Sequence, residues 1–321
     1  MDPNHKPLVT IFGASGFVGT QIVQLLARKG YRIRAAVRRP DLAGHLRPLG
    51  AVGQVVPIQA NVRDAASVLR AVRGADIVIN LVGIGFSRGR QTFAAVNVGG
   101  ARNVAEAARA VGAGTLVHMS GLGFTPDSES GFARSKLDGE AAVLAAYPQA
   151  IIMRPSIIFG QGDGFFSLIG TLARLFPVLP MIEGATRLQP VYVGDVADAF
   201  ALAAEGAAKP ARIYELGGPE VATHRQLWEL ALRETGRSNP LVPISSGLAR
   251  LMAVPMGLLP KPLLTADQIA LLGYDNVVSA EAQRERRTLL GLGIAPTALE
   301  TILPTYLWRF RRNGQFDRVV A

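Results

Sequence analysis

The sequence predicts an α/β protein in which a doubly wound parallel sheet carries a smaller, mostly helical C-terminal lobe. Three observations lead to this prediction. Short apolar runs alternate with helical patterns through the first half of the chain, a glycine-rich turn follows the first run, and the alternation stops after about Gly160. This is the order of elements in a Rossmann-type fold. With 321 residues, 49% of them hydrophobic and 18% charged, the chain is long and apolar enough for such a core.

Six short runs rich in β-branched residues are predicted to form the strands. Each is apolar along its whole length, as expected of parallel strands buried on both faces. The runs are Leu8–Phe12, Ile33–Val37, Val55–Ile58, Ile77–Leu81, Leu116–Met119 and Ile151–Met153. Between them, apolar residues recur at helical spacing from Val18 and stop at Gly30, and Ala94–Ala110 is rich in strong helix formers.

The second half of the chain has a different pattern. Leu188–Val193 and Arg212–Leu216 again resemble strands and flank a predicted helix over Asp195–Glu205, so we expect both runs to return to the sheet. Asp195 and Thr223 are predicted to be helix N-caps. The predicted division is a Rossmann core over residues 1–160, returning segments over 187–218, and the smaller lobe over 161–186 and 219–321.

The composition excludes several classes of protein. The chain has no cysteine, which rules out disulfides, iron–sulfur clusters and a cysteine nucleophile and fits a reducing compartment. Its four histidines are scattered, with no carboxylate at metal-ligand spacing, so we predict no metal site. We expect no signal peptide, because the N-terminus lacks a basic segment followed by a long apolar run, and we expect no transmembrane helix.

The formal net charge of +10 is the unusual feature of the composition. Residues 1–74 hold 11 Lys and Arg against 3 Asp and Glu, so most of the excess lies in the first quarter. Such a surface suits nucleic acid, phosphate-bearing ligands or an anionic membrane. We expect six of these residues to face an acidic neighbour or anionic lipid: Arg28, Lys29, Arg32, Arg34, Arg70 and Arg73. We expect no nucleic-acid partner, because an aromatic or recognition-helix context is absent there.

A glycine-rich turn follows the first predicted strand. It reads Gly13-Ala14-Ser15-Gly16-Phe17-Val18-Gly19 and leads into a helix. In a dinucleotide-binding turn the first glycine permits the tight turn, the second lets backbone N–H groups approach a pyrophosphate, and the third lets helix and strand pack closely. The helix N-terminus adds a favourable dipole. The position of this turn therefore predicts dinucleotide binding.

The end of the second predicted strand indicates which dinucleotide binds. An NAD site usually has an acidic residue here to hold the ribose 2′-hydroxyl, but this chain has Arg38 and Arg39. A guanidinium forks onto phosphate oxygens, whereas an acid would repel them. The arginines favour NADP(H), with Arg38 the better candidate of the two. The alternative is that both are solvated, and Asp41 follows too late to replace the missing acid.

These features resemble the short-chain dehydrogenase/reductase superfamily in its extended, atypical branch. The stretches that carry the resemblance are GASGFVG from Gly13, NVRD from Asn61, LVG from Leu81, VNVGGARNV from Val96, HMSGLG from His118, SKLDGE from Ser135 and RPSIIFGQGDGFF from Arg154. Within this branch the chain is similar to the nucleotide-binding accessory subunits (alpha subcomplex subunit 9) of respiratory complex I in their bacterial form. The closer match rests on LQPVYVGDVADA from Leu188, YELGGPEV from Tyr214, TADQIALLGYDNVVS from Thr265 and GIAPTALETILPTYLWRFRRNGQF from Gly293.

The resemblance implies NADPH as the cofactor and a set of positions that bind it. They are Gly13, Ser15, Gly16, Phe17 and Val18 along the pyrophosphate, Arg38 at the adenosine phosphate, Asn61 and Val62 near the adenine, Leu81, Val82 and Gly83 beside the ribose, Lys136 at the nicotinamide ribose, and Pro155 beside the nicotinamide. Arg39 and Ser120 are predicted to be further cofactor-binding residues.

The catalytic pair of the superfamily is incomplete in this chain. Active members use Tyr-x-x-x-Lys, in which the lysine lowers the pKa of the tyrosine so that the phenol exchanges a proton with the substrate. Here the pair is Phe132 and Lys136, and a phenyl ring has no proton to give. Ser120 lies at the right strand end, but Gly121 matches the position that usually bears the catalytic hydroxyl. We therefore expect the chain not to be catalytic itself; the alternative is an active reductase whose acid comes from elsewhere.

The resemblance also implies a role and partners. It implies an accessory subunit on the peripheral arm of complex I, at the cytoplasmic face of the inner membrane, that binds NADPH structurally and contributes to assembly or stability. Its partners would be other complex I subunits. Leu248–Leu264 and Tyr306–Arg312 combine apolar residues with basic ones, which suits a peripheral contact with an anionic membrane or a protein interface, with core packing as the alternative. An NADP-dependent reductase or epimerase of the extended type and an NADP(H)-sensing regulator remain the other candidate functions.

Overall fold

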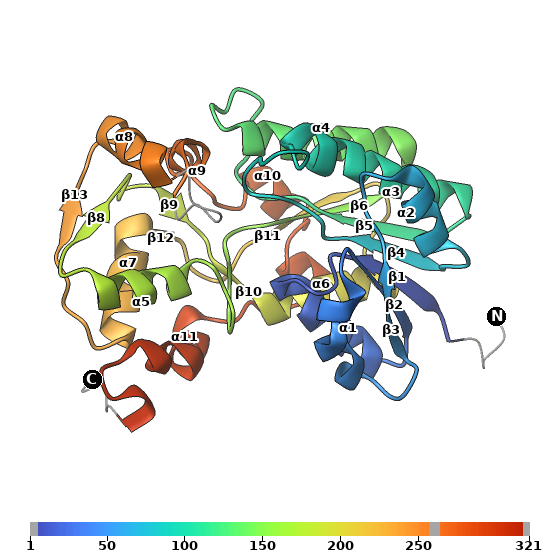
Figure 1. The fold of residues 1–321 in the computed structure, drawn as a ribbon, viewed down its shortest axis with the longest axis horizontal. Coiled ribbons are helices and arrows are strands. Elements are labelled where there is room, and N and C mark those ends of the chain that lie inside the picture. The colour runs from blue at the N-terminus through green and yellow to red at the C-terminus, as the bar shows by residue number, and fades with distance from the viewer. Residues whose placement is uncertain (1–5, 257–263, 317–321) are drawn as a thin grey trace.

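The computed structural model describes residues 6–256 and 264–316 (Figure 1). Its central strands are β1 (Leu8–Phe12), β2 (Arg32–Val37), β3 (Val55–Gln59), β4 (Ile77–Asn80), β5 (Thr115–Met119), β6 (Ile151–Pro155) and β11 (Ile213–Leu216). They form a seven-stranded sheet in the order β11-β6-β5-β4-β1-β2-β3, and all of the neighbouring strands are parallel. The predicted doubly wound sheet is confirmed, and its order reverses between β1 and β4, which is where such sheets bind ligands.

Helices cover both faces of the sheet (Figure 1). On one face α1 (Phe17–Arg28) packs against α6 (Val193–Ala204). On the other, α3 (Gly99–Ala110) packs between α2 (Ala65–Val72) and α4 (Gly131–Ala146). Each face has its own core of buried aliphatic and aromatic side chains, so the sheet is apolar on both sides. The predicted helix over Ala94–Ala110 forms, with its first part, Ala94–Val98, π-helical.

Two predictions about the returning segments are wrong. Leu188–Val193 splits into β9 (Arg187–Leu188) and β10 (Val191–Tyr192), and neither joins the main sheet. β9 pairs with β12 (Ala222–Thr223) and β10 with β7 (Ile158–Phe159), because Pro190 between them has no N–H to continue a ladder. Asp195 lies inside α6 rather than at its N-cap, and its carboxylate accepts hydrogen bonds from Thr297 N and Oγ1 at 2.7 and 2.8 Å.

Most of the remaining elements form the lobe at the other end of the molecule (Figure 1). Its core is built by α5, α7 and α11, and two short strands pair beside it. Thr223 is the N-cap of α7, as predicted, since its Oγ1 accepts from Gln226 N at 3.2 Å. The elements of the lobe are α5 (Phe166–Leu175), β8 (Leu179–Met181), α7 (His224–Glu234), β13 (Leu241–Pro243), α8 (Ser246–Met256), α9 (Ala266–Leu271) and α11 (Leu299–Leu307). The short helix α10 (Ala280–Arg284) lies beside the sheet instead, where Ala282 packs with Leu122.

Short 3₁₀ turns lie at Pro40–Leu42, Gly44–Leu49, Leu290–Leu292, Trp308–Phe310 and Gly314–Phe316. Within the described ranges, none of the helices combines the length and the apolar character that a membrane span requires.

Candidate functional site

The glycine-rich turn connects β1 to α1 in a conformation that depends on its glycines. Gly13 has φ +81°, a left-handed conformation that glycine adopts without strain. A Cβ on Gly19 would lie 2.4 Å from the carbonyl oxygen of Gly13, so the third glycine is needed for helix and turn to pack. Gly16 is the N-cap of α1 and offers no side-chain acceptor to the first N–H groups of the helix. These N–H groups are therefore available to an anion.

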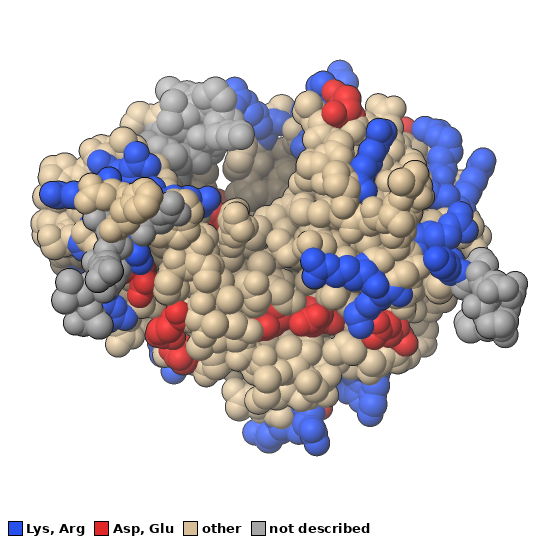
Figure 2. All heavy atoms as spheres, turned by 90° about the horizontal axis from the view of Figure 1, so that it is seen from below, with Lys and Arg blue, Asp and Glu red and all other residues tan. Residues whose placement is uncertain are grey.

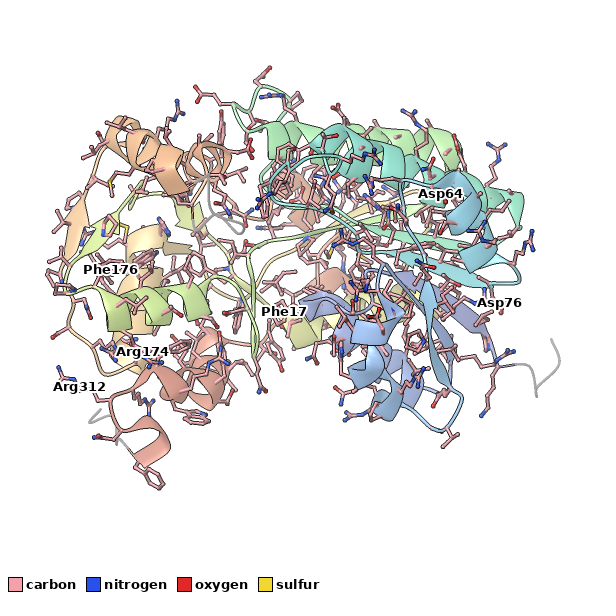
Figure 3. All side chains as sticks on the ribbon, in the orientation of Figure 1. Phe17, Asp64, Asp76, Arg174, Phe176 and Arg312 are labelled. Carbon is pink, nitrogen blue, oxygen red and sulfur yellow. The ribbon has the colours of Figure 1, made fainter. Side chains whose placement is uncertain are left out.

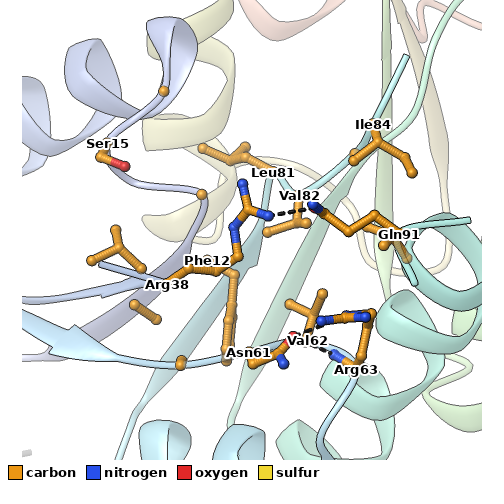
Figure 4. A pocket seen from close by; sticks show the side chains of 17 residues that line it. Phe12, Ser15, Arg38, Asn61, Val62, Arg63, Leu81, Val82, Ile84 and Gln91 are labelled. Carbon is orange, nitrogen blue, oxygen red and sulfur yellow. Dashed lines mark hydrogen bonds between the residues drawn. The ribbon is translucent and has the colours of Figure 1, made fainter. Parts of the chain in front are cut away.

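A pocket of about 280 Å³ opens beside this turn at the carboxyl ends of β1 to β4 (Figure 4). Nine of the residues predicted to bind the cofactor line it, and they come from four different strand ends: Gly13, Ser15, Gly16, Arg38, Asn61, Val62, Leu81, Val82 and Gly83. The structure thus brings together the predicted pyrophosphate, adenine and ribose positions in one cavity.

Several residues that line the pocket were not predicted. Phe12, Ile84 and Val96 add apolar surface, and Arg63 and Gln91 add polar groups. Arg63 and Gln91 lie far from Arg38 in sequence; Arg63 directly follows the predicted adenine positions Asn61 and Val62, whereas nothing in its local context marks Gln91. Their position results from β2 and β3 being neighbours and from the segment after β4 folding back across the strand ends.

Arg39 does not line the pocket. Its guanidinium makes a two-pronged ion pair with Asp41, with Nε–Oδ1 and Nη2–Oδ2 distances of 3.0 and 2.7 Å. The hydrogen bond from Arg39 lowers the pKa of Asp41. Arg38 instead donates to the side-chain oxygen of Gln91, as the dashed line in Figure 4 shows. The two adjacent arginines therefore point to different surroundings.

Phe17, Val18 and Pro155 lie outside the pocket. Val18 is buried in the core between sheet and α1. Phe17 lies between the sheet and the lobe (Figure 3), close enough to Gly160 and Gly162 that a Cβ on either would be 3.6 Å from its ring. Pro155 ends β6 and accepts a hydrogen bond from Leu122 N at 2.9 Å.

Lys136 projects from α4 toward the ends of β4 and β5. Its side chain is buried, and its Nζ donates to the carbonyl oxygen of Met119 at 2.6 Å. A Cβ built on Gly83 would lie 3.7 Å from this nitrogen, so the lysine approaches the inner side of the pocket-lining strand end. Burial lowers the pKa of Lys136 to about 8, against the opposing attraction of Glu140. Among the residues that the structure describes, no carboxylate is in hydrogen-bond contact with this ammonium group.

Two polar atoms near Lys136 have no hydrogen-bond partner within the described part of the chain, namely Ser120 Oγ and His118 Nε2, and both are buried. Desolvation lowers the pKa of His118 well below its ordinary value, with the Lys136 charge adding to the effect. Native proteins rarely leave buried polar groups unpaired, so these two atoms fit the polar edge of a bound ligand.

Two phenylalanine rings pack against Phe132, the residue at the position predicted for the catalytic tyrosine. The Phe132 ring meets Phe124 and Phe93 edge to face, with centroid distances of 5.5 and 6.0 Å. A Cβ on Gly121 would lie 2.4 Å from the Phe124 ring, so this ring occupies the space that a serine side chain at residue 121 would need. Hydroxyl groups are therefore replaced by hydrocarbon at both positions.

Comparisons with known proteins agree with this geometry. The model of the NAD dependent epimerase/dehydratase family matches residues 9–217. The chain is also 33% identical over 324 residues to the mitochondrial NADH dehydrogenase (ubiquinone) 1 alpha subcomplex subunit 9 of Arabidopsis thaliana, a match that covers 96% of this chain and 79% of the relative. The chain belongs to the alpha subcomplex subunit 9 branch of this family.

Two further proteins are similar to this alpha subcomplex subunit 9 family member. A ceramide reductase of Caulobacter vibrioides is 36% identical over 197 residues, which cover 61% of each protein. The crystal structure of a dTDP-glucose 4,6-dehydratase from Streptomyces venezuelae, with NAD and TYD bound, has a TM-score of 0.71 at 19% identity and covers 96% of this chain and 98% of its own. This likeness supports the fold alone.

Proposed function

We propose that this chain is a non-catalytic accessory subunit of respiratory complex I that binds NADP(H) as a structural cofactor. The observation that carries the non-catalytic part is the packing of Phe132 between Phe93 and Phe124, because the side chain at residue 132 is a phenyl ring, which has no proton to exchange. The accessory role follows from membership of the alpha subcomplex subunit 9 branch. Tight binding without turnover would stabilise the folded subunit by mass action.

The residues present fit a nicotinamide dinucleotide. The glycine turn and the uncapped start of α1 would hold the pyrophosphate, while Asn61 and Val62 would flank the adenine. Arg38 at the end of β2 favours the 2′-phosphate of NADP(H) over the free hydroxyl of NAD(H). The buried, unpartnered Ser120 Oγ and the Lys136 ammonium would meet the nicotinamide ribose. When bound, the nicotinamide supplies hydride-transfer chemistry, which this chain lacks the acid to complete.

We also propose that the chain sits peripherally at the cytoplasmic face of the membrane and contacts anionic lipid. At the end of α5, Leu175 and Phe176 are 68% and 51% exposed. Arg174 and Arg312 lie at the same end (Figure 3) and both help, after burial, to lower the pKa of Arg237. A cluster of arginines beside exposed apolar side chains suits an anionic headgroup region.

The two C-terminal segments predicted to dock differ in structure. In Tyr306–Arg312, Tyr306 and Phe310 are buried in the lobe core, so core packing accounts for part of this segment. In Leu248–Leu264, Leu251 and Val254 are each 69% exposed on α8, while residues 257–263 lie outside the described part of the chain.

Native mass spectrometry of the mildly solubilised membrane fraction tests the proposal. We expect the chain to appear within the respiratory complex, carrying one nucleotide that is identified as NADP or NADPH after denaturation. A pool of free chain with no complex attached would refute the accessory role. A complex-bound chain that releases no nucleotide would refute the cofactor.

The similarity to a ceramide reductase makes an NADP-dependent reductase the second candidate. This function requires a proton donor in place of Phe132, and the three rings leave none at that position. Steady consumption of NADPH by the unmodified protein with a ceramide-type ketone would favour the reductase, whereas consumption that begins with Phe132→Tyr would support the lost-donor explanation.

A further inference from the structure

Two arginines from neighbouring strand ends reach the same short segment. Arg38 follows β2 and donates from Nη1 to the side-chain oxygen of Gln91. Arg63 follows β3 and donates from Nη1 to the carbonyl oxygen of Arg90 at 2.8 Å. Arg88 and Gln91 close this segment into a tight hairpin through backbone hydrogen bonds of 2.9 and 3.0 Å. The two guanidinium groups therefore contact consecutive residues of one hairpin at the edge of one pocket (Figure 4).

The partners of these two arginines leave both charges uncompensated. Arg38 donates to a neutral amide oxygen, and Arg63 donates to a backbone carbonyl and, at 3.4 Å, to the Asn61 amide oxygen. Within residues 6–256 and 264–316, neither guanidinium forms an ion pair, whereas Arg39 is neutralised by Asp41. The nearby Asp64 carboxylate accepts from Ala66 N as the N-cap of α2.

We propose that Arg38 and Arg63 together form a two-cation site for the adenosine 2′-phosphate, with the Arg88–Gln91 hairpin holding both guanidinium groups in place. The inference rests on the proposed binding of NADP(H) and assigns Arg63, rather than Arg39, as the second cation. Each guanidinium has five N–H donors, of which the hydrogen bonds above use one in Arg38 and two in Arg63. The remaining donors and the two charges match a phosphate dianion.

Equilibrium titrations with NADPH and with NADH test the assignment, because the two nucleotides differ in the 2′-phosphate and the ratio of their affinities isolates its contribution. We expect Arg63→Met to weaken NADPH binding about tenfold or more, as loss of a charge-assisted hydrogen bond does, and to leave NADH binding within about twofold. Arg39→Met, the matched control, should leave the ratio unchanged.

Gln91→Glu is a second variant that keeps the size of the side chain. It places a carboxylate against Arg38, which would compete with the phosphate, so we expect NADPH binding to weaken more than NADH binding. A thermal melt of each variant reports whether it is folded. This variant tests the Arg38 half of the two-cation site, because the Gln91 side chain contacts Arg38 and is changed only in charge. If Arg63→Met proves unstable, Arg63→Gln, which keeps a polar side chain, replaces it in the same titrations.

The outcomes distinguish failure of the proposed NADP(H) cofactor from failure of the two-arginine site. Wild-type protein that binds neither nucleotide would overturn both the proposed cofactor and this site. Wild-type protein that prefers NADPH, with Arg63→Met and Gln91→Glu showing the same preference, would overturn the two-arginine site alone. If Arg63→Met weakens NADPH binding and NADH binding equally, Arg63 only holds the hairpin against the end of β3 and does not bind the 2′-phosphate.

Discussion

At the scale of single residues, the inner end of the site is defined by what surrounds Lys136. The lysine keeps its place on α4 and its carbonyl partner, Met119, although the tyrosine that it would normally assist is Phe132. Its ammonium is buried, and burial lowers its pKa. Burying this charge is costly, and Lys136 has no tyrosine to assist in proton transfer. The buried position fits the proposed role of Lys136 in holding the nucleotide.

This burial makes stability depend on pH. Lys136 titrates at about 8 in the folded protein but at its ordinary 10.5 in the unfolded chain. Between these values the unfolded chain binds more protons, so the free energy of unfolding rises with pH, by about 3 kcal/mol at most. Thermal melts from pH 7 to 10.5 should show this rise in the wild type and not in Lys136→Met. Lys209→Met, at an exposed position, should follow the wild type.

Gly121 makes a second prediction at this scale. A side chain at residue 121 would collide with the Phe124 ring, so we expect Gly121→Ala to lower the free energy of unfolding by about 1–3 kcal/mol. Removing the ring as well, in the double variant Gly121→Ala/Phe124→Leu, should recover part of this loss of unfolding free energy. Gly44→Ala is the control, because a Cβ there meets open space. Urea denaturation measures all three, and a Gly121→Ala protein as stable as wild type would mean that the ring moves aside freely.

At the scale of elements, the lobe supports the first turn of α4. The Asp267 carboxylate, one residue into α9, accepts from Ser130 Oγ at 2.8 Å and from Phe132 N at 3.2 Å. It therefore satisfies the N–H group of Phe132 and holds the N-cap hydroxyl of Ser130 at the start of the helix that carries both Phe132 and Lys136. A favourable charge at a helix N-terminus adds to this effect.

Removing this carboxylate should loosen the helix start. We expect Asp267→Ala to cost about 1–2 kcal/mol of unfolding free energy and to speed amide hydrogen exchange at residues 131–134. Asp138→Ala, at an exposed position on the same helix, is the control and should change neither quantity. Unchanged exchange in Asp267→Ala would contradict the bracing role.

Strands were easier to predict from the sequence than the site. Runs such as Leu8–Phe12 are buried on both faces, so their composition alone reveals them. Leu188–Val193 also resembles a strand, but Pro190 divides it and its two halves pair outside the sheet with distant segments. Asp195 looks like an N-cap but accepts from Thr297, 102 residues away. Arg63 joins the pocket only because the chain folds β3 beside β2. Contacts between distant segments decide such cases, and local pattern does not encode them.

At the scale of the whole molecule, charge is unevenly distributed. Figure 2 shows Asp and Glu in a band across the middle of one face, with Lys and Arg above it, below it and at both ends. Some of the excess basic residues form contacts within the chain. Lys29 pairs with Glu205 at 2.7 Å, and Arg34 donates to the carbonyl oxygens of Ala71 and Arg73 at 2.7 and 2.9 Å. These two residues are therefore less available to an external partner than the sequence suggests.

Vesicle binding distinguishes which end meets lipid. We expect wild-type protein to bind vesicles of phosphatidylcholine with phosphatidylserine, and to bind less as salt increases. The double variant Arg174→Gln/Arg312→Gln should bind about thirtyfold more weakly, since each basic residue near such a surface contributes about 1 kcal/mol and about 1.4 kcal/mol is a factor of ten. Arg70→Gln/Arg73→Gln is the matched control on the other end. A loss confined to this control pair would place the lipid contact on the core instead of the lobe.

The hydrogen bonds of Asn276 have a consequence for how the chain matures. Every residue that lines the adenosine pocket lies between Phe12 and Val96, whereas Asn276 bonds to Leu122 and Ser156 at the other end of the sheet. Since chains fold from the N-terminus during synthesis, the nascent protein could capture the adenosine half of a nucleotide long before the nicotinamide half is braced. Ribosome-bound chains halted after residue 200 should already retain 2′,5′-ADP on an affinity matrix.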